Sequence, residues 1–446
     1  MSSSKPGPRI LLVRPDYGTR LADVARIVTE PLDLEYLAAT AVQENCEYRI
    51  HDPVVARACF EDVLAEFRPD IVGISGYYPA KDKMIRYARR AKAHDSRVLT
   101  ITGGVHAELN CSDFYDNAVD LVVHSGGTDT FQRILQAIKA GGVLCGIPGT
   151  CFRKEDNSWV SASKVLFDPA RLPIPDRAHF NEHKAKFSYL RYGPTALVKS
   201  AYGCPFKCRF CYCRLLNNGR YSARDLEDVV AEIKGIECDR IWIVDDTFLL
   251  EMDRVRRFIE LLEREAIRKE FIIYSRSQFI AGHPEVVPLL KKAGVIDVII
   301  GFEAINREKL ASYNKSISEQ ESRRCIELLK AASIECTGLF IMDADSSVSD
   351  FAALDRWIGS AGLTTYTLSI FSPYPGTESF DEYRSRLTTT DCRKWDLLHL
   401  VMDPSGMSRF TFYLLVFYMH LKVLFRNRAM RNYVLSFSWL RTKAMP

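Results

Sequence analysis

The sequence lacks any apolar run long enough to cross a membrane, and it lacks a secretory signal at its start. A helix that spans a bilayer needs about 20 consecutive apolar residues, and no stretch reaches that length; the apolar segment at residues 410–419 is ten residues long. Residues 1–8 (MSSSKPGP) contain no apolar core of the kind that an export signal requires. We therefore expect a cytoplasmic protein.

The chain also lacks a strong charge of either sign and a disulfide framework. Its formal net charge is only +4 over 446 residues, so nothing in its composition indicates a nucleic-acid partner. The 13 cysteines are odd in number and scattered, unlike the paired cysteines of small secreted domains. The composition is that of a globular protein, 47% hydrophobic and 26% charged, and the length allows two domains plus an appendage.

Residues 1–145 form a first predicted domain, in which short apolar strands alternate with amphipathic helices. We predict strands over residues 9–14, 48–51, 70–75, 97–102 and 120–124, and helices over residues 31–44, 59–67, 80–93 and 128–140. This alternation predicts an α/β fold, a Rossmann-like, doubly wound parallel sheet with helices on both faces. Ligands of such sheets bind beyond the carboxyl ends of the strands.

A connector at residues 146–194 separates this unit from a second one at residues 195–385. Its prolines favour an extended tether, with a short strand pair near residues 150–153 and 159–161. In the second unit we predict six strands alternating with longer helices, at residues 195–201, 240–244, 271–274, 297–302, 335–341 and 365–371. Six such repeats predict a partial (β/α)6, TIM-like barrel with its functional groups at the carboxyl ends of the strands.

Three cysteines directly follow the first strand of this second unit. Cys204, Cys208 and Cys211 lie in the segment CPFKCRFC, and Cys213 comes two residues later. Thiols at this density are metal ligands more often than packing groups. Three ligands without a distant fourth suit a metal centre that keeps one coordination position open. A four-cysteine zinc site is the alternative, but the Cys-Tyr-Cys spacing is cramped for joint ligation, so we interpret Cys213 as a non-ligand.

This motif, placed after the first strand of a six-repeat α/β pattern, resembles that of the radical S-adenosylmethionine (SAM) superfamily. The residue before the third cysteine, Phe210, is aromatic, as is usual there. The resemblance implies that Cys204, Cys208 and Cys211 bind three irons of a 4Fe–4S cluster and that the fourth iron binds SAM. It further implies that an electron from a donor such as flavodoxin or ferredoxin cleaves SAM to a 5′-deoxyadenosyl radical, which an enclosed barrel mouth shields from water.

The same resemblance implies SAM-binding roles for polar residues at other strand ends, and for Phe210. Asp245 and Asp246 follow the second strand, where the superfamily often places groups near the methionyl amine. Ser275 and Arg276 follow the third strand and are candidates to hold the ribose or the carboxylate. Glu303 ends the fourth strand and is a candidate contact to ribose or substrate. For each acidic residue, helix capping or a place in a solvated loop stays open.

The first domain resembles the cobalamin-binding domain that precedes many radical SAM enzymes. Short motifs at three strand ends, made of small residues and one histidine, carry the resemblance. It implies that these residues line a cobalamin site: Ser75, Gly76, Gly103, Gly104, His106, Ser125, Gly126 and Gly127. Glycines there let a bulky ligand approach the backbone. Two features depart from the family pattern. The Gly-Glu-Gly-Glu position has no acidic residue here, and the Asp-x-His-x-x-Gly motif that supplies a cobalt ligand is absent.

From these resemblances we predict a radical SAM enzyme that uses cobalamin to transfer a methyl group to an unactivated centre of a small or lipid-like molecule, in a natural-product or lipid pathway. If the first domain binds no cobalamin, the alternatives are aminocarboxypropyl transfer, diol dehydration or epimerisation. A non-catalytic metal- or cobalamin-binding module is a remote alternative from a different class.

Residues 386–446 form a tail for which we predict helices at residues 395–400 and 408–425. The second of these is apolar nearly all round and is bordered by basic residues, among them Lys422, Arg426 and Arg428. We favour packing of this helix across the barrel mouth. Contact with a membrane surface is the alternative.

Overall fold

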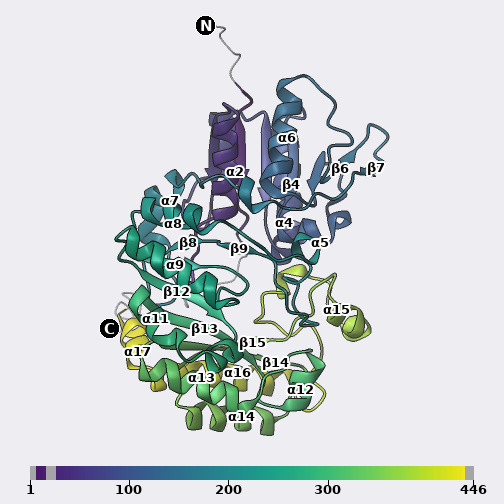
Figure 1. The fold of residues 1–446 in the computed structure, drawn as a ribbon. Helices are drawn as coiled ribbons and strands as arrows, with labels where there is room; N and C mark the ends of the chain where they lie inside the picture. Colours follow the sequence, from purple (N-terminus) through teal and green to yellow (C-terminus); the bar gives the residue numbers. More distant parts are fainter. Residues whose placement is uncertain (1–6, 17–26, 437–446) are drawn as a thin grey trace, which may run out of the picture.

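The computed structural model describes residues 7–16 and 27–436. Figure 1 shows two α/β units, an N-terminal unit at the top in purple to blue and a larger unit below it in teal to green. The last helices, in yellow, lie on the lower unit, at the end of the molecule away from the N-terminal unit. The fold class predicted from the sequence is therefore confirmed.

The N-terminal unit contains a seven-stranded sheet with the order β2-β1-β3-β4-β5-β6-β7. Its strands are β1 (Ile10–Val13), β2 (Tyr48–His51), β3 (Ile71–Ser75), β4 (Leu99–Gly103), β5 (Leu121–Val123), β6 (Thr150–Arg153) and β7 (Trp159–Ser161). The first five pair in parallel, whereas β6 and β7 are antiparallel. The predicted strand pair after residue 146 is confirmed, and the sheet continues through it to Ser161.

Helices cover both faces of this sheet, because successive strand residues point to opposite sides. The helices are α2 (Leu32–Gln43), α3 (Phe60–Phe67), α4 (Lys81–His94), α5 (Val105–Leu109) and α6 (Gly127–Lys139). In β1, Ile10 and Leu12 pack in one apolar cluster with α2 and α6. Leu11 and Val13 pack in a second cluster with α3 and α4. The order β2-β1-β3-β4 places β1 beside β3 at the point where the strand order reverses, the usual ligand position in such sheets.

The second unit is a partial barrel of six parallel strands with the order β8-β11-β12-β13-β14-β15. These are β8 (Ala196–Val198), β11 (Arg240–Ile243), β12 (Glu270–Ser275), β13 (Val295–Glu303), β14 (Glu335–Met342) and β15 (Thr365–Ile370). A short hairpin, β9 (Ala201–Tyr202) and β10 (Ser222–Ala223), follows β8.

Two sets of helices accompany the barrel strands. The longer ones join successive strands and form the outer layer: α8 (Leu226–Gly235), α9 (Met252–Arg264), α11 (Val286–Ala293), α13 (Glu319–Ala331) and α14 (Val348–Ala361). Short ones follow strands β12, β13 and β15 at their carboxyl ends: α10 (Ser277–Gly282), α12 (Arg307–Ser312) and α15 (Glu378–Tyr383). The short helices lie at the end of the barrel where the predicted site residues lie.

The connector is packed against the barrel, so the expectation of an extended tether is wrong for much of it. It contains a short helix, α7 (Ala178–His183), and the Tyr189 ring packs at a tilt against Trp242 of β11 with ring centroids 4.4 Å apart. Just before α7, the buried Arg177 guanidinium bonds Glu30 and Glu232 at 2.7 Å each and the Leu197 carbonyl at 2.7 Å. This charge network links the N-terminal unit, the connector and the barrel, since one cation satisfies groups from all three.

The tail contains α16 (Arg409–Arg426) and α17 (Arg428–Leu435). The helix predicted at residues 395–400 is wrong: Leu397 has φ +65°, and the Asp396 carboxylate accepts from the Leu398 amide at 3.0 Å, which forms a turn. The expected packing across the barrel mouth is also wrong, because α16 lies along the edge strand β15 and against α14. None of the helices in the described ranges combines the length and apolar character that a membrane-spanning helix needs.

A buried carboxyl inside the barrel predicts a pH-dependent stability. Burial raises the pKa of Asp297, at the start of β13, to about 7. The folded protein therefore holds this proton more tightly than the unfolded chain, and stability falls as pH rises from the unfolded pKa near 4 to about 7, by roughly 1.4 kcal/mol per pH unit. We expect Asp297→Asn to flatten this decline. Unfolding midpoints of both proteins between pH 5 and pH 8 test it; parallel curves would contradict it.

Candidate active site

A hairpin presents the cysteine loop at the carboxyl end of the first barrel strand. β9 pairs with β10 through Ala201–Ala223 and Tyr202–Ser222, so the 19 or so intervening residues close back on themselves. Gly203, immediately before Cys204, has φ +75°, and a Cβ there would lie 2.2 Å from the Arg220 carbonyl oxygen. Only glycine fits this crossing, and it starts the cysteine loop in a defined direction.

Two other barrel loops hold the cysteine loop in place. The Arg209 amide donates to the Tyr313 carbonyl at 3.1 Å, and Asn314 donates from its side chain to the Lys207 carbonyl at 2.8 Å. The Arg209 guanidinium pairs with Glu378 of α15 at 3.1 Å. Phe210 packs edge-on against Tyr313, with ring centroids 5.1 Å apart. The loops after β13 and β15 therefore fix the loop after β8.

The thiols of this loop are free, partly buried and close enough to influence one another electrostatically. Burial raises the pKa of Cys204 to about 11 and also raises the pKa of Cys208. The other two thiols, of Cys211 and Cys213, form a hydrogen bond with each other. This bond lowers the pKa of Cys211 and raises that of Cys213. Within the described ranges, no three His, Cys, Asp or Glu side chains stand close enough together to hold a metal ion as they are placed.

The donor set nevertheless fits an iron–sulfur cluster. Cys204, Cys208 and Cys211 are three unpaired thiols on a single loop, and thiolates are the usual ligands of such clusters. A cluster is larger than a single ion, so its ligands stand farther apart than those of one metal ion. The Cys213 thiol forms a hydrogen bond with the Cys211 thiol and lies beside Asp246; its interpretation as a non-ligand stays a prediction.

The structure gives the two adjacent aspartates after β11 different surroundings. Asp245 is buried and accepts hydrogen bonds from the Ser200 amide at 2.6 Å, from the Ala201 amide at 3.0 Å and from the Ser200 hydroxyl. Its carboxylate therefore ties β11 to the start of the cysteine loop. Asp246 keeps one buried oxygen, Oδ2, without a partner among the described residues, and its charge acts on Cys204, Cys211 and Cys213.

Residues after β12 lie beside the same loop. The Arg276 guanidinium stacks over the Phe206 ring, 3.9 Å from its centroid, and donates to Gln278 at 2.9 Å. The Ser275 hydroxyl donates to the Arg276 carbonyl at 3.1 Å. Arg276 is near enough to Cys208 to lower the pKa of that thiol, against the larger effect of burial. The structure thus brings Arg276 to the cysteine loop, whereas the hydroxyl of Ser275, the last residue of β12, bonds only the adjacent backbone in the described structure.

Glu303, at the end of β13, is held in an unusual position. It has φ +63°, a conformation that costs a residue other than glycine of order 1 kcal/mol. Lys315 binds its carboxylate at 2.7 Å. A Cβ at Gly301 would lie 2.3 Å from Glu303 Oε1 and 2.9 Å from Lys315 Nζ, so Gly301 leaves the space that this ion pair fills. Both charges act on Cys208.

The glycines predicted to line a cobalamin site also pack the loops of the first sheet against each other. A Cβ at Gly104, which has φ +92°, would lie 2.7 Å from the Gly76 backbone, and one at Gly126 would lie 2.4 Å from Thr130 Oγ1. A Cβ at Gly103, by contrast, would meet only Val123, at 3.7 Å. Gly127 has φ +47° and, like Gly103, has room for a Cβ, which would meet only Phe167, at 3.8 Å.

The polar candidates in this region have partners within the chain. His106 is buried and bonds Asp113 at 2.8 Å. The Ser75 hydroxyl donates to Asp33, and the Ser125 hydroxyl accepts from the Val165 amide at 2.9 Å. Their predicted contact with cobalamin stays a prediction.

One buried polar atom at these strand ends has no hydrogen-bond partner among the described residues, and it fits a polar ligand. It is Thr102 Oγ1 in β4. Buried polar groups are rarely left unbonded in native proteins. A ligand with a hydrogen-bonding group at the carboxyl end of β4 would satisfy this atom.

The carboxyl ends of the two sheets face each other. Asn110, after α5, donates to the Pro375 carbonyl beyond β15 at 2.9 Å, and the Asn217 amide of the cysteine loop donates to Glu108 at 2.6 Å. Tyr77, after β3, lies within electrostatic range of Cys213 and Asp246. The predicted cobalamin site and the cysteine loop thus lie on the same interface.

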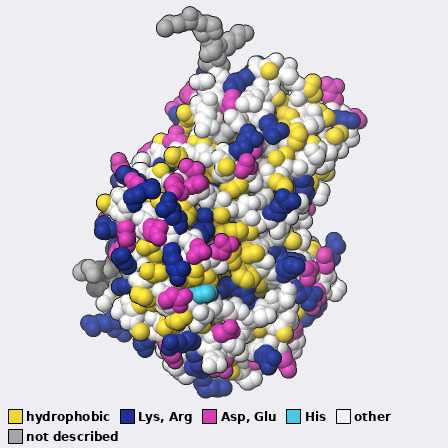
Figure 2. Space-filling view, viewed as in Figure 1, with side chains coloured by type: hydrophobic (Ala, Val, Ile, Leu, Met, Phe, Trp, Pro, Cys, Tyr) yellow, Lys and Arg dark blue, Asp and Glu magenta, His cyan; other side chains and the backbone are white. Residues whose placement is uncertain are grey.

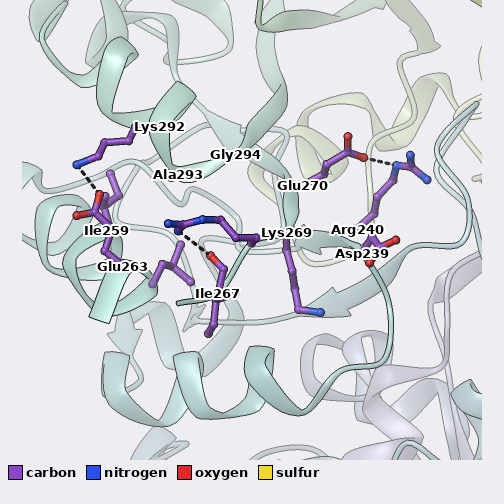
Figure 3. Close-up of a pocket in the computed structure, with 12 residues that line it drawn as sticks. Asp239, Arg240, Ile259, Glu263, Ile267, Lys269, Glu270, Lys292, Ala293 and Gly294 are labelled. Atoms are coloured by element: carbon purple, nitrogen blue, oxygen red, sulfur yellow. Dashed lines mark hydrogen bonds and ion pairs between the residues drawn. The ribbon is translucent and has the colours of Figure 1, made fainter. Parts of the chain in front are cut away.

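A pocket of about 360 Å³ lies at the opposite, amino-terminal ends of β11, β12 and β13 and is shown in Figure 3. Its cations already have partners: Lys292 pairs with Glu263 at 2.6 Å and Arg240 with Glu270 at 2.6 Å, and Lys269 bonds two backbone carbonyls. Because active sites of such barrels lie at the carboxyl ends, this pocket is not part of the candidate site.

Sequence reasoning missed two contributors to the site. Lys315 is twelve residues from Glu303 in the chain, and no local spacing pairs them. Tyr374 lies after β15 and contacts Tyr212 of the cysteine loop, with ring centroids 5.3 Å apart. Tyr374 could have been found from the sequence, because a Pro-Gly turn follows it directly after the last predicted strand, where site residues are expected.

Comparisons with known proteins agree with this geometry. The Radical SAM superfamily profile matches residues 198–358, and the B12 binding domain profile matches residues 19–135. The chain is 27% identical over 378 residues to the hopanoid C-3 methylase of Methylococcus capsulatus, covering 84% of this chain and 72% of that protein. It is 27% identical over 417 residues to an uncharacterized methyltransferase of Pyrococcus horikoshii, covering 88% and 87%.

A solved structure shares the fold of both units together. The radical SAM methyltransferase TsrM of Kitasatospora setae, solved with cobalamin and a [4Fe-4S] cluster, superposes with a TM-score of 0.68 at 17% identity, covering 86% of this chain and 76% of that one. The cysteine loop, the partial barrel and the N-terminal parallel sheet therefore have one explanation: the chain belongs to the radical SAM superfamily, in the branch with an N-terminal B12-binding domain.

Proposed function

We propose that this radical SAM enzyme is a cobalamin-dependent methyltransferase that acts on an unactivated centre of a small molecule. The proposal rests on one observation: the carboxyl ends of the strands in the two sheets face each other. The cysteine loop therefore lies against the loops of the B12-binding domain. The relatives named as methylases or methyltransferases support this reaction and do not favour the alternatives without cobalamin.

The chain would hold an iron–sulfur cluster and cobalamin at this interface, with SAM between them and the residues described next. Cys204, Cys208 and Cys211 would hold the cluster, and the loops that end β3, β4 and β5 would hold cobalamin. When bound, the cluster supplies a single electron to SAM and cobalamin carries a methyl group. A flavodoxin- or ferredoxin-like protein would supply the electron.

The residues around the cysteine loop would bind and orient SAM. The unpartnered Asp246 Oδ2 can accept a hydrogen bond from the SAM amino group, which would also satisfy this buried oxygen. Arg276, stacked on Phe206, offers guanidinium N–H groups to a carboxylate. Glu303, held by Lys315, presents fixed acceptors that suit ribose hydroxyls. Tyr212 and Tyr374 border the interface, and their bulk helps to exclude water.

The ion pair beside the cysteine loop gives a first test of the SAM site. We expect Glu303→Gln to raise the KM for SAM about tenfold, because a hydrogen bond to a charged acceptor contributes about 1.5–3 kcal/mol. We expect Gly301→Ala to have a similar effect, since its Cβ would displace the pair. Initial rates of SAM consumption at graded SAM concentrations measure this. Arg323→Gln, which removes an exposed ion pair with Glu319, is the control; an unchanged KM in both test variants would count against the assignment.

The proposed reaction is tested by the products formed from SAM. We expect the reconstituted protein with cobalamin to form S-adenosylhomocysteine, and the same protein without cobalamin to form none, because methyl transfer leaves that product. Aminocarboxypropyl transfer would instead leave methylthioadenosine. Liquid chromatography with mass spectrometry distinguishes the two, and methylthioadenosine formed equally with and without cobalamin would overturn the proposal.

A further inference from the structure

Helix α16 is apolar on two opposite faces, and only one of them is covered in the described structure. The covered face consists of Phe412, Val416, Met419 and Val423, which are buried. Phe412 packs on Phe351 of α14 with ring centroids 5.4 Å apart, and the Met419 carbonyl accepts from a tyrosine hydroxyl of β15 at 2.6 Å. This face accounts for the attachment of the helix to the barrel.

The opposite face is exposed along the whole length of the helix. Its residues follow each other at intervals of three or four positions, so they form one stripe: Phe410 (77% exposed), Leu414 (53%), Phe417 (62%), Leu421 (38%) and Phe425 (72%). Tyr418 and Leu435 are also exposed. Single exposed apolar residues are ordinary, but a contiguous stripe with three phenylalanines marks an interaction surface.

The two helices that form this surface carry charges of one sign. From Arg409 to Leu435 the chain has four arginines and one lysine and no Asp or Glu. Three of these cations pair with acidic residues outside the two helices: Arg409 with Asp403, and Lys422 and Arg426 with Asp355 of α14. Arg428 and Arg431 of α17 have no acidic partner among the residues that the structure describes.

We propose that the α16 stripe, together with the α17 arginines, is a docking surface for an anionic lipid bilayer. Amphipathic helices with Phe and Leu on one face and basic residues beside them bind at the headgroup boundary, and anionic headgroups attract neighbouring arginines. A second copy of the chain would offer no negative charge from these two helices. Figure 1 shows α16 and α17 on the barrel, at the end away from the N-terminal unit, so docking there leaves the opposed strand ends free.

Vesicle flotation of the whole chain, reconstituted with its cluster, tests the proposal. We expect the protein to float with vesicles of phosphatidylcholine and phosphatidylglycerol in equal parts, and to bind vesicles of phosphatidylcholine alone at least about tenfold more weakly, because the arginines then lose their partners. Added salt should weaken binding to the anionic vesicles. No flotation with anionic vesicles would overturn the proposal.

Two variants separate the apolar and charged contributions. We expect the triple variant Phe410→Ser, Phe417→Ser and Phe425→Ser to lose binding at least about tenfold, since it removes the phenylalanines of the stripe. Arg428→Gln with Arg431→Gln should lose the preference for anionic vesicles. The arginine variant keeps the test valid if the triple variant does not fold, and unchanged binding in either folded variant would contradict the proposal.

A matched control replaces equally exposed apolar residues elsewhere. Val143→Ser, Ile174→Ser and Val348→Ser alter side chains that are 79%, 60% and 51% exposed and lie outside the tail. This control should float as the unmodified protein does. Light scattering after gel filtration tests the alternative that a second copy of the chain binds the stripe. If the unmodified protein is a dimer that does not bind vesicles, and the triple variant is a monomer, the stripe is a dimer interface and the proposal is overturned.

Discussion

Replacing Cys204, Cys208 or Cys211 with alanine is expected to lower reductive SAM cleavage at least about a hundredfold. Loss of a residue that only hydrogen-bonds a metal ligand already lowers metal affinity or activity by up to about a hundredfold, and loss of a ligand itself should lower it at least as much. Two thiolates would then have to hold a cluster for which we propose three ligands, and SAM would lose its open iron position. The measurement is the yield of 5′-deoxyadenosine after dithionite reduction, together with the iron and sulfide content of the reconstituted protein.

Two cysteines outside the proposed ligand set serve as controls. Cys145→Ala changes a partly buried thiol far from the loop in sequence, and we expect it to keep full activity. Cys213→Ala should keep its iron and sulfide content, although Cys213 bonds a neighbouring thiol. Loss of iron in Cys213→Ala, or tight zinc binding by the unmodified protein, would instead indicate a four-cysteine site.

Gly103→Leu is expected to lower cobalamin affinity at least about tenfold, which corresponds to about 1.4 kcal/mol. Gly103 ends β4 at the carboxyl edge of the first sheet, and its Cβ would meet only Val123, at 3.7 Å. A Cβ can therefore be added at this position without a clash, and a leucine there would compete for the space that the proposed cobalamin site needs. Cobalamin retained after gel filtration, measured by its absorbance, gives the readout.

Gly235→Leu is the matched control, because the last residue of α8 has nothing within 4 Å of an added Cβ. It should retain as much cobalamin as the unmodified protein. Equal retention in both variants would place cobalamin elsewhere or show that the B12-binding domain binds none.

The strands and long helices could be predicted from the sequence because their apolar periods match their burial. The alternate residues of β1 face two different helix layers, as a doubly wound sheet requires. The position of α16 could not be predicted, since a helix that is apolar on two faces does not show which face meets the barrel. The helix predicted at residues 395–400 was wrong because the prediction relied on the apolar residues of this segment. It took no account of Asp396, whose carboxylate accepts from the Leu398 amide and forms a turn.

The cysteine loop could be predicted because its ligands are close in sequence, whereas the rest of the site depends on tertiary contacts. Asp245 and Asp246 are indistinguishable by pattern, yet one carboxylate satisfies three backbone and hydroxyl donors and the other keeps an unpartnered oxygen. The Glu303–Lys315 pair likewise depends on the space left by Gly301. Figure 2 shows Lys, Arg, Asp and Glu side chains interspersed over the visible face, consistent with the small net charge.

The most direct test of the account follows the methyl group of SAM. The reconstituted protein, loaded with cobalamin and reduced, is incubated with SAM that carries a trideuterated methyl group, and the corrinoid and nucleoside products are analysed by mass spectrometry. We predict that the deuterium label appears in the corrinoid fraction together with an equal amount of S-adenosylhomocysteine. SAM consumed only to 5′-deoxyadenosine and methionine, with an unlabelled corrinoid, would contradict a cobalamin-dependent methyl transfer.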